Sequence, residues 1–463
     1  MKTKGLLTRG ALAGVVVAAL ALSACGSGGS TKSAPTTTNP PANAKIVKSY
    51  GPGVTADTVK IGVTLINYDL IKDLPDVSEV RLEQQQIYQA FIDNVNAHGG
   101  IAGKKIVPVY KLYIPVGSAG LITICTALAE DDNVFATIGT YFDTSGDAQL
   151  CMAKQHKRVL LTFDLNQATL KQAPPGLIVT PGYTPERSVK ILLDLLQKQH
   201  KLDGKTVGVM GNAASSTIVN NTIVPELKRL NVKMGATGLL SVGGSTDTTT
   251  AQSQLDSLIE RWKTENVDTV FISSKEAAAL RFVQKLRKEM PDVQLLADDA
   301  SLLSSAQGAV RDKLKPNPYE GVIVSAGPTS TEYENGPNWA YCKAIYKKQT
   351  GKDAPGPNDV IPYKGSKTKT VGTYGTINDA CQLVSMFSDI GNRVGKWLNN
   401  DNWTTTVDRY GEIANRGTGQ YSSLHTGKYE AEDNWRLLEF DSSLPPTGNW
   451  KSLTPLQNET SGY

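Results

Sequence analysis

Short β-branched runs alternate with longer amphipathic runs along this chain from Val59 to Ala326. The first such pair is "VKIGVTL" at 59–65, which predicts a strand, and the segment at 79–100, whose apolar residues recur with helical spacing. A glycine pair ends this predicted helix. Strands that alternate with helices of this length form right-handed βαβ units and a parallel sheet. The alternation restarts after "VTPGYTPE" at 179–186. The sequence therefore predicts an α/β protein with two doubly wound parallel-sheet lobes.

The individual elements are predicted from the same periodicity. In the first set we expect strands at 59–65, 104–112, 134–139 and 158–163, with helices at 79–100, 118–132 and 145–156. In the second set we expect strands at 205–210, 235–240, 267–273, 293–298 and 320–326, with helices at 185–200, 216–230, 249–266 and 275–290. Beyond residue 326 the alternation weakens, and we expect helices at 335–349 and 373–391, a polar surface loop at 350–370 and a strand at 435–440.

The N-terminus is typical of an exported lipoprotein. The basic segment "MKTKGLLTRG" precedes twelve apolar residues at 11–22, which is the order of a secretory signal peptide. Twelve residues are too few for a permanent membrane span, and the basic flank argues against the alternative of a buried N-terminal helix. "LSAC" at 22–25 resembles a bacterial lipobox, which implies a signal peptide at 1–24 and lipidation of Cys25. Residues 25–53 then read as a flexible tether, since they are rich in Gly, Ser, Thr and Pro.

Four cysteines remain once Cys25 is assigned to the anchor. An even number in an exported protein predicts disulfides, and proximity favours Cys125 with Cys151 and Cys342 with Cys381, although four cysteines allow three pairings. Four buried free thiols are the alternative. No CxxC spacing and no clustered histidines accompany the cysteines, so we expect no metal site.

Charge and missing motifs narrow the function. Of 48 Lys and Arg residues three lie in the signal peptide, which leaves 45 against 44 Asp and Glu and gives no argument for a nucleic-acid partner. No phosphate loop, dinucleotide fingerprint, HExxH or GxSxG is present in the globular part, and the four histidines are widely scattered. We therefore expect no enzyme and no cofactor, and nothing after the leader reaches 18 consecutive apolar residues.

Three stretches, at 59–65, 88–110 and 125–146, resemble type I periplasmic binding proteins of the leucine/isoleucine/valine-binding branch. The most specific match is "NVNAHGGIAGKK" at 94–105, which is similar to that branch's "IN-x-x-GGI-x-GRK" turn. Its glycines end the helix and reverse the chain. The resemblance covers residues 55–310 well and weakens towards the end.

The resemblance implies two lobes joined by hinge strands, with a ligand bound in the cleft between them as they close. It places lobe 1 at 54–180 and 327–424, lobe 2 at 181–326 and 425–455, and a tail at 456–463. It further implies a lipid-anchored, extracytoplasmic solute-binding protein, in a Gram-positive cell, that feeds an ABC permease. A ligand-sensing ectodomain that signals to a membrane partner is the alternative, and an extracellular enzyme is a third possibility.

In this family the loop after the third strand binds the ligand carboxylate. Here that loop is residues 139–146 and is two residues longer than the family's "GP-x-x-SG". Ser145 begins a predicted helix, so it serves either an anion site or a plain N-cap. The longer loop contains Tyr141 and Phe142, whose rings either stack on an apolar ligand or pack against the lobe. This departure from the family pattern puts an α-amino acid in doubt as the ligand. The candidate ligand-binding residues in lobe 1 are Tyr141, Phe142, Asp143, Thr144, Ser145, Asp164 and Asn166.

The second lobe carries small residues at 211–216, where the family places an aromatic–glycine pair, so the pocket is expected to be roomier on this side. Asp299, in an acid pair at 298–299, is our choice to hold a ligand ammonium, the alternative being a solvated loop acid. The remaining candidates are Tyr183, Asn212, Ser215 and Ser273. The expected ligand is an amino acid or a small apolar or aromatic carboxylate.

Overall fold

A computed structural model describes most of the chain after the predicted leader and tether. The described residues are 46–73, 77, 79–115, 117–143, 145–242, 249–274, 277–298, 300–357, 359–366, 369–412, 421–445 and 447–463. All of them belong to one unit of the fold, Asn39–Tyr463. The predicted signal peptide, Cys25, most of the tether, Thr144 and Asp299 lie outside the described residues.

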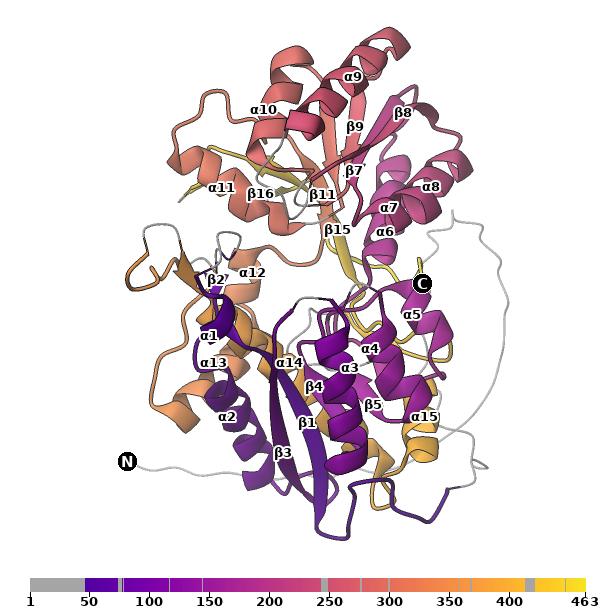
Figure 1. The fold of residues 1–463 in the computed structure, drawn as a ribbon, viewed down its shortest axis with the longest axis vertical. Coiled ribbons are helices and arrows are strands. Elements are labelled where there is room, and N and C mark those ends of the chain that lie inside the picture. Colours follow the sequence, from indigo (N-terminus) through magenta and orange to yellow (C-terminus); the bar gives the residue numbers. More distant parts are fainter. Residues whose placement is uncertain are drawn as a thin grey trace, which may run out of the picture. The chain divides into compact units, whose positions relative to one another are not determined.

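The first sheet is parallel and five-stranded (Figure 1). Its order is β3 (Lys105–Tyr113), β1 (Thr58–Ile66), β4 (Ala136–Gly139), β5 (Val159–Leu161) and β6 (Ile178–Val179). Helices α2 (Gln84–Ala97) and α14 (Thr373–Val394) pack together on one face, and α3 (Ala119–Thr126) and α4 (Asp147–Leu150) lie on the other. The late helices α13 (Pro337–Thr350) and α15 (Asn400–Asp408) join the same core.

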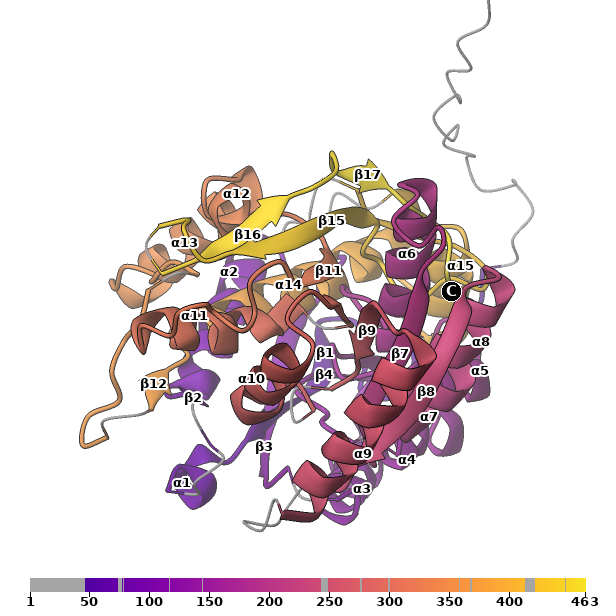
Figure 2. The same ribbon diagram turned by 90° about the horizontal axis from the view of Figure 1, so that it is seen from above.

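The second sheet repeats this order and adds antiparallel strands. Its parallel part is β8 (Lys233–Leu240), β7 (Thr206–Asn212), β9 (Thr269–Ile272), β10 (Gln294–Ala297) and β11 (Ile323–Ala326), after which come β15 (Asn434–Asp441) and β16 (Asn449–Ser452). Figure 2 shows helices α9 (Thr249–Glu265), α10 (Leu280–Glu289) and α11 (Leu303–Arg311) on one face and α6 (Pro185–Lys198) with α8 (Val224–Arg229) on the other. The sheet thus separates two apolar cores, one on each face.

The smaller elements complete the described structure. They are α1 (Tyr68–Ile71), α5 (Gln167–Gln172), α7 (Ser216–Ile218), α12 (Ser330–Glu334), the 3₁₀ turn η4 (Ala300–Leu302), and strands β2 (Glu79–Val80), β12 (Thr370–Val371), β13 (Gly411–Glu412), β14 (Ser423–Leu424) and β17 (Gln457–Asn458). Three π-helical turns, η1 (Ala127–Asp131), η2 (Cys151–Gln155) and η3 (Val219–Ile223), continue α3, α4 and α7. In the described part of the chain, no helix is both long and apolar enough to cross a membrane.

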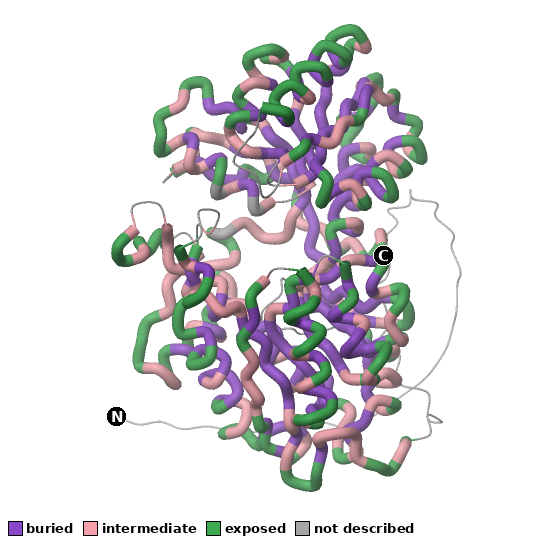
Figure 3. The backbone as a smooth tube through the Cα atoms, viewed as in Figure 1, coloured by how far each residue is buried: buried purple, intermediate pink, exposed green. Residues whose placement is uncertain are grey.

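The strands of both sheets are buried because helices cover both faces of each sheet. All seven residues of β7 are buried, and Figure 3 shows the strands buried beneath helices whose outer faces are exposed. Parallel strands covered on both faces have near-continuous apolar runs, which is the pattern that the sequence shows. A glycine in each first strand permits close helix packing, because a Cβ at Gly62 would lie 2.7 Å from Leu128 Cδ1 and one at Gly208 would lie 2.4 Å from Trp262 Nε1.

The chain passes between the two sheets three times: before α6, after β11 and before β15. Two of these crossings pair with each other, since the Thr180 N–H donates to the Tyr429 carbonyl over 3.0 Å and the Ala431 N–H donates to the Thr180 carbonyl over 2.9 Å. Beside them, the buried Asp433 carboxylate pairs with Arg187 at 2.7 Å and with Lys428 at 3.0 Å. The residue limits proposed above for the two lobes stay a prediction.

Several predicted boundaries were wrong. Residues 79–80 form β2 rather than the start of a helix, and α2 begins at Gln84. The helix expected from residue 275 begins at Leu280. The polar segment 350–370 ends in β12, which pairs with β2. Helices α5, α11 and α15 were not anticipated.

Both cysteine pairs are disulfides in the structure. Cys125 of α3 is joined to Cys151 of η2, and Cys342 of α13 is joined to Cys381 of α14. These are the pairings that sequence proximity favours. Each disulfide joins two helices that pack against the first sheet.

Candidate functional site

A cavity of about 680 Å³ lies where strands of both sheets end. It is larger than four other hollows of the described surface, which hold about 380–410 Å³. Its lining residues are Phe142, Asp143, Ser145, Phe163, Asp164, Leu165, Asn166, Ala168, Tyr183, Pro185, Glu186, Ala214, Ser215, Thr217, Ile218, Ser273, Ser274 and Asp298. These follow β4, β5 and β6 of the first sheet and β7, β9 and β10 of the second. Ligands of open α/β sheets bind at this carboxyl edge.

The two inserted aromatic residues have different environments. Tyr141 is fully buried, and its hydroxyl has no hydrogen-bond partner among the described residues. Burial raises the pKa of Tyr141 well above its usual range. Phe142 is 51% exposed and lines the cavity. Of the two alternatives set out for these rings, Tyr141 packs in the core while Phe142 faces the cavity.

The Asp143 carboxylate organises the loop that follows β4. It accepts hydrogen bonds from the Ser145 N–H at 3.0 Å, from the Ser145 hydroxyl at 2.8 Å and from the Ala148 N–H at 2.8 Å. Ser145 lines the cavity but is not the N-cap of α4, a position held by Gly146 in the left-handed region at φ +83°. A glycine is required there, because a Cβ would lie 2.0 Å from the Thr169 hydroxyl oxygen. The Ser145 hydroxyl nevertheless accepts from the Asp147 N–H at 3.2 Å, so Ser145 supports the first turn of α4 although Gly146 holds the N-cap position.

Asp164 and Asn166 hold the neighbouring loop after β5. The Asp164 carboxylate accepts a hydrogen bond from the Tyr141 N–H at 2.8 Å. Burial raises the pKa of Asp164 even though this hydrogen bond favours its charged form. The Asn166 side chain accepts from the Thr169 N–H at 2.8 Å and thereby caps α5. Both residues also line the cavity.

Gln149, which sequence analysis missed, joins these two loops. Its side-chain amide donates to the carbonyls of Tyr141, Asp143 and Asp164 at 3.0, 3.1 and 3.1 Å. The side chain is buried on α4, and it holds together the two loops whose residues line the cavity. An isolated Gln on a predicted helix gave no signal of this role.

The second sheet contributes mainly small polar residues. The Ser215 hydroxyl accepts from the Asn212 N–H and the Asn212 side chain accepts from the Ser215 N–H, both at 2.9 Å, which closes the turn after β7. Ser215 lines the cavity, whereas Asn212 is 2% exposed and is not among the lining residues. Ser273 donates its hydroxyl to the Asp298 carboxylate at 2.5 Å, and both line the cavity. Asp298 is the described member of the acid pair, and Asp299 lies outside the described residues.

The segment leading into α6 brings an aromatic ring and a further carboxylate. Tyr183 lines the cavity, and its ring packs on that of Trp435 with centroids 4.7 Å apart. Glu186 lies in the first turn of α6, accepts a hydrogen bond from the Gln167 N–H at 3.3 Å and lines the cavity. Burial raises the pKa of Glu186.

Several lining residues were absent from the candidates drawn from the sequence. They are Phe163, Leu165, Ala168, Pro185, Glu186, Ala214, Thr217, Ile218, Ser274 and Asp298. Phe163, Leu165, Ser274 and Asp298 lie at or just after the ends of predicted strands, so their position was a usable signal. Ile218 lies in the first turn of a predicted helix. For an apolar residue at such a position, the sequence does not indicate whether the side chain faces a core or a cavity.

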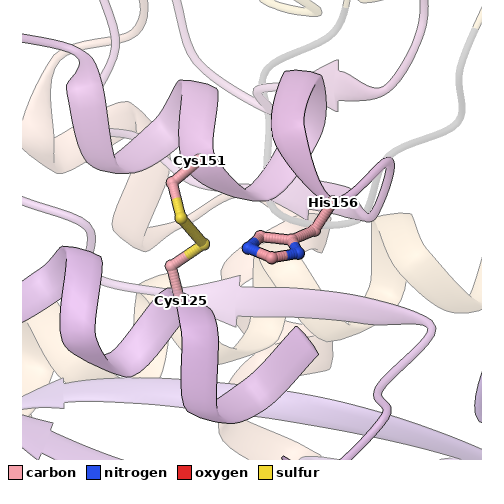
Figure 4. Close-up of side chains that lie close together, drawn as sticks. All are labelled: Cys125, Cys151 and His156. Atoms are coloured by element: carbon pink, nitrogen blue, oxygen red, sulfur yellow. A yellow bond between two sulfur atoms is a disulfide. The ribbon is translucent and has the colours of Figure 1, made fainter. Parts of the chain in front are cut away.

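One cluster of potential metal ligands occurs among the described residues, formed by Cys125, Cys151 and His156 (Figure 4). The two sulfur atoms are joined as a disulfide, so neither is the thiolate that binds a metal. His156 also lies 3.7 Å from the Glu130 carboxylate. This cluster is a disulfide with a neighbouring histidine, and it is not a metal site as it stands.

Comparison with known proteins identifies related sequences and folds. A family model described as "Periplasmic binding protein" matches residues 83–363. No curated protein matches the chain in sequence.

Three solved structures of similar fold illustrate the range of these relatives. A leucine-, isoleucine-, valine-, threonine- and alanine-binding protein from Brucella ovis is 15% identical, with a TM-score of 0.59 over 86% of this chain and 95% of its own. A fatty acid ABC transporter substrate-binding protein from Thermomonospora curvata is 15% identical, with a TM-score of 0.57 over 89% and 95%. A solute-binding protein from R. palustris in complex with 4-hydroxybenzoate is 13% identical, with a TM-score of 0.58 over 88% and 99%. At such identities the likeness shows the fold alone.

Proposed function

The chain belongs to the family of periplasmic binding proteins, which work outside the cytoplasm, and we propose on this premise that it is the solute-binding protein of an ABC importer. Structural neighbours include ABC transporter substrate-binding proteins named for amino acids, fatty acids and 4-hydroxybenzoate. In this role the chain catalyses no reaction. It captures a small molecule and presents it to the permease.

The cavity is the observation that carries this proposal. At about 680 Å³ it falls within the usual size of small-molecule sites, and it draws residues from the carboxyl ends of strands in both sheets. A ligand that contacts both sheets stabilises the conformation in which the two sheets lie closest to each other. The three crossings then serve as the hinge of a closing movement.

We assign the ligand contacts by position in the lining. Phe142 and Tyr183 offer aromatic surface, while Ser145, Ser215 and Ser273 offer hydroxyl groups. The carboxylates of Asp143 and Asp164, together with the amide of Asn166, supply the polar groups on the side of the first sheet. Asn212 acts indirectly by holding the turn of Ser215. On the side of the second sheet we assign the acid Asp298, which lines the cavity; Asp299 lies outside the described residues.

We further propose that Cys25 anchors the mature chain through lipid and that residues 25–53 let it reach its permease. A Cys25→Ala variant should leave the membrane fraction, because the acyl chains supply the apolar area that holds a lipoprotein to the bilayer. Metabolic labelling with an alkyne fatty acid, followed by fractionation, measures both effects. Labelling of Cys25→Ala at the level of the unchanged chain would contradict the anchor.

The solute-binding function is tested by purifying the full chain in mild detergent and identifying co-purified small molecules by mass spectrometry. Broad panels of amino acids, organic acids, amines and aromatic compounds are then screened by thermal shift, since a ligand that binds the native state raises Tm. Absence of any co-purified or stabilising solute would contradict the proposal. A bound solute whose uptake by intact cells is unaffected by loss of the chain would favour the sensing ectodomain instead.

A further inference from the structure

Carboxylates dominate the charged groups of the cavity. Its described lining contains Asp143, Asp164, Glu186 and Asp298, and no Lys, Arg or His is present among those lining residues. Burial raises the pKa of Asp164 and of Glu186, which shows that their charged forms lack full compensation by nearby cations. A cation that entered the cavity would supply that compensation.

Two basic side chains of the described residues act on these carboxylates, and each already has a partner. Arg81, whose charge lowers the pKa of Asp164, pairs with Asp379 at 2.6 Å and with Glu79 at 3.0 Å. Lys190 lowers the pKa of Glu186, and its ammonium donates to the Gln167 side chain at 3.3 Å. Arg81 is therefore balanced by carboxylates outside the lining, whereas Lys190 keeps its charge and offsets part of that of Glu186 alone. One such cation leaves the four lining carboxylates with an excess of negative charge.

Four backbone N–H groups, in the loop where the family binds a ligand carboxylate and at the start of the next helix, are also engaged. In the loop after β4, the Tyr141 N–H donates to Asp164, the Phe142 N–H donates to the Tyr113 hydroxyl, and the Ser145 N–H donates to Asp143. The Ala148 N–H at the start of α4 also donates to Asp143. Two side-chain carboxylates of the protein thus take the place that a ligand carboxylate would occupy in this loop. A bound anion would have to displace them and would meet their charge.

We propose that this cavity selects a ligand with an amine or other cationic group on an apolar or aromatic body, and that it discriminates against the corresponding carboxylate. The aromatic surface of Phe142, Phe163 and Tyr183 receives the body, and the carboxylates receive the cation. This inference rests on the proposed solute-binding function. It departs from the carboxylate ligand expected from sequence and from the leucine, fatty acid and 4-hydroxybenzoate named for structural neighbours.

The test is a matched series with one ring and four polar groups: the cation 2-phenylethylamine, the zwitterion phenylalanine, the anion 3-phenylpropionate and the neutral 2-phenylethanol. Tryptamine and its matched acid and alcohol extend the series to a larger body. Isothermal titration of the full chain should give the amine an affinity at least tenfold above that of the matched acid and alcohol. Raising the ionic strength should weaken amine binding and leave the alcohol unchanged.

Two substitutions locate the effect. Asp298→Asn and Glu186→Gln preserve shape and remove one charge each, so each should weaken amine binding about fivefold to tenfold and leave the alcohol nearly unchanged. Asp131→Asn is the matched control, because Asp131 is an exposed acid outside the lining and its loss changes the net charge equally. Tm and circular dichroism establish that each variant is folded. If both lining variants bind the amine as the control does, the inference is wrong.

Failure of this inference differs from failure of the proposed function. If the acid or the zwitterion binds more tightly than the amine, or if the alcohol binds as well as the amine, selection for a cation is overturned while solute binding stands. If the chain retains no co-purified solute and binds no member of these series or of the broad panels, the proposed function fails and this inference fails with it.

Discussion

The two sheets share one strand order but equip the cavity differently. In each sheet the first strand lies between the second and the third, and each first strand carries a glycine, Gly62 or Gly208, beneath a helix side chain. The first sheet adds charged and aromatic residues such as Phe142 and Asp164, whereas the second adds mainly small ones such as Ser215. The shared topology determines where the cavity lies, and the loops after the strands determine the chemistry of its lining.

The sheets also differ in their covalent support, and this difference predicts the largest effect. Both disulfides join helices of the first sheet and close separations of 26 and 39 residues. Replacing either pair with serines should lower the free energy of unfolding by about 3–4 kcal/mol. Urea unfolding measures the loss, and hydrogen exchange should place it in β1 and β4.

The control for this prediction is reductant, which should destabilise the unchanged chain and have no further effect on a variant that lacks both pairs. Equal loss of protection in β7 and β9 would contradict the difference between the sheets.

The two glycines give a matched pair of substitutions. Gly208→Ala brings a Cβ within 2.4 Å of Trp262 Nε1, and this buried indole is held by its hydrogen bond to the Ala236 carbonyl at 2.8 Å. Gly62→Ala meets the methyl groups of Leu128 at 2.7 and 2.9 Å, which can move, and the Thr137 hydroxyl oxygen at 3.0 Å. We expect losses of about 3 kcal/mol for Gly208→Ala and about 1 kcal/mol for Gly62→Ala in urea unfolding. The reverse order would show that packing beneath the first sheet is the more rigid.

The crossings belong to neither sheet, and their buried lysine predicts a pH effect. Burial lowers the pKa of Lys428 to about 8, with Asp433 opposing this and Arg187 adding to it. Above pH 8 and below the ordinary pKa of 10.5, the folded chain has lost a proton that the unfolded chain still binds, so stability rises with pH.

Lys428→Met removes this titration. Between pH 8 and pH 9.5, the free energy of unfolding of the unchanged chain should rise by roughly 1–2 kcal/mol relative to that of the variant. Urea unfolding at each pH measures this difference. Parallel stability curves for the two proteins would show that the lysine keeps an ordinary pKa at the crossings.

The smallest effects separate two neighbouring rings of the first sheet. Tyr141→Phe removes a buried hydroxyl without a partner among the described residues, so stability should be unchanged or higher by up to about 1 kcal/mol. Phe142→Ala truncates a ring that is 51% exposed, so it should weaken ligand binding more than it changes Tm. A loss of affinity for Tyr141→Phe with none for Phe142→Ala would reverse this assignment.

Sequence periodicity predicted both sheets because buried parallel strands have continuous apolar runs that differ from striped helices. It missed α15, although Asn399 caps that helix by accepting from the Asn402 N–H at 2.9 Å and such a cap is visible in sequence. The π-helical turns after α3 and α4 could not be predicted, because they depend on packing rather than on residue preference.

For the cavity, sequence located the loops but not the roles of their side chains. Phe142 and Ser273 line it, and both lie at or just after the end of a predicted strand. Tyr141 and Asn212 do not, because adjacent loop residues point in different directions that only the fold determines. The capture of loop N–H groups by Asp143 likewise requires three-dimensional contacts between residues several positions apart.

The central claim is that one solute occupies a cavity shared by both sheets. Hydrogen exchange of the full chain, with and without the solute that binds most tightly, tests it directly. Binding should slow exchange together in the loops after β4 and β5 and in the loops after β7 and β9. Protection confined to the loops of one sheet, or found only away from these four loops, would contradict the account.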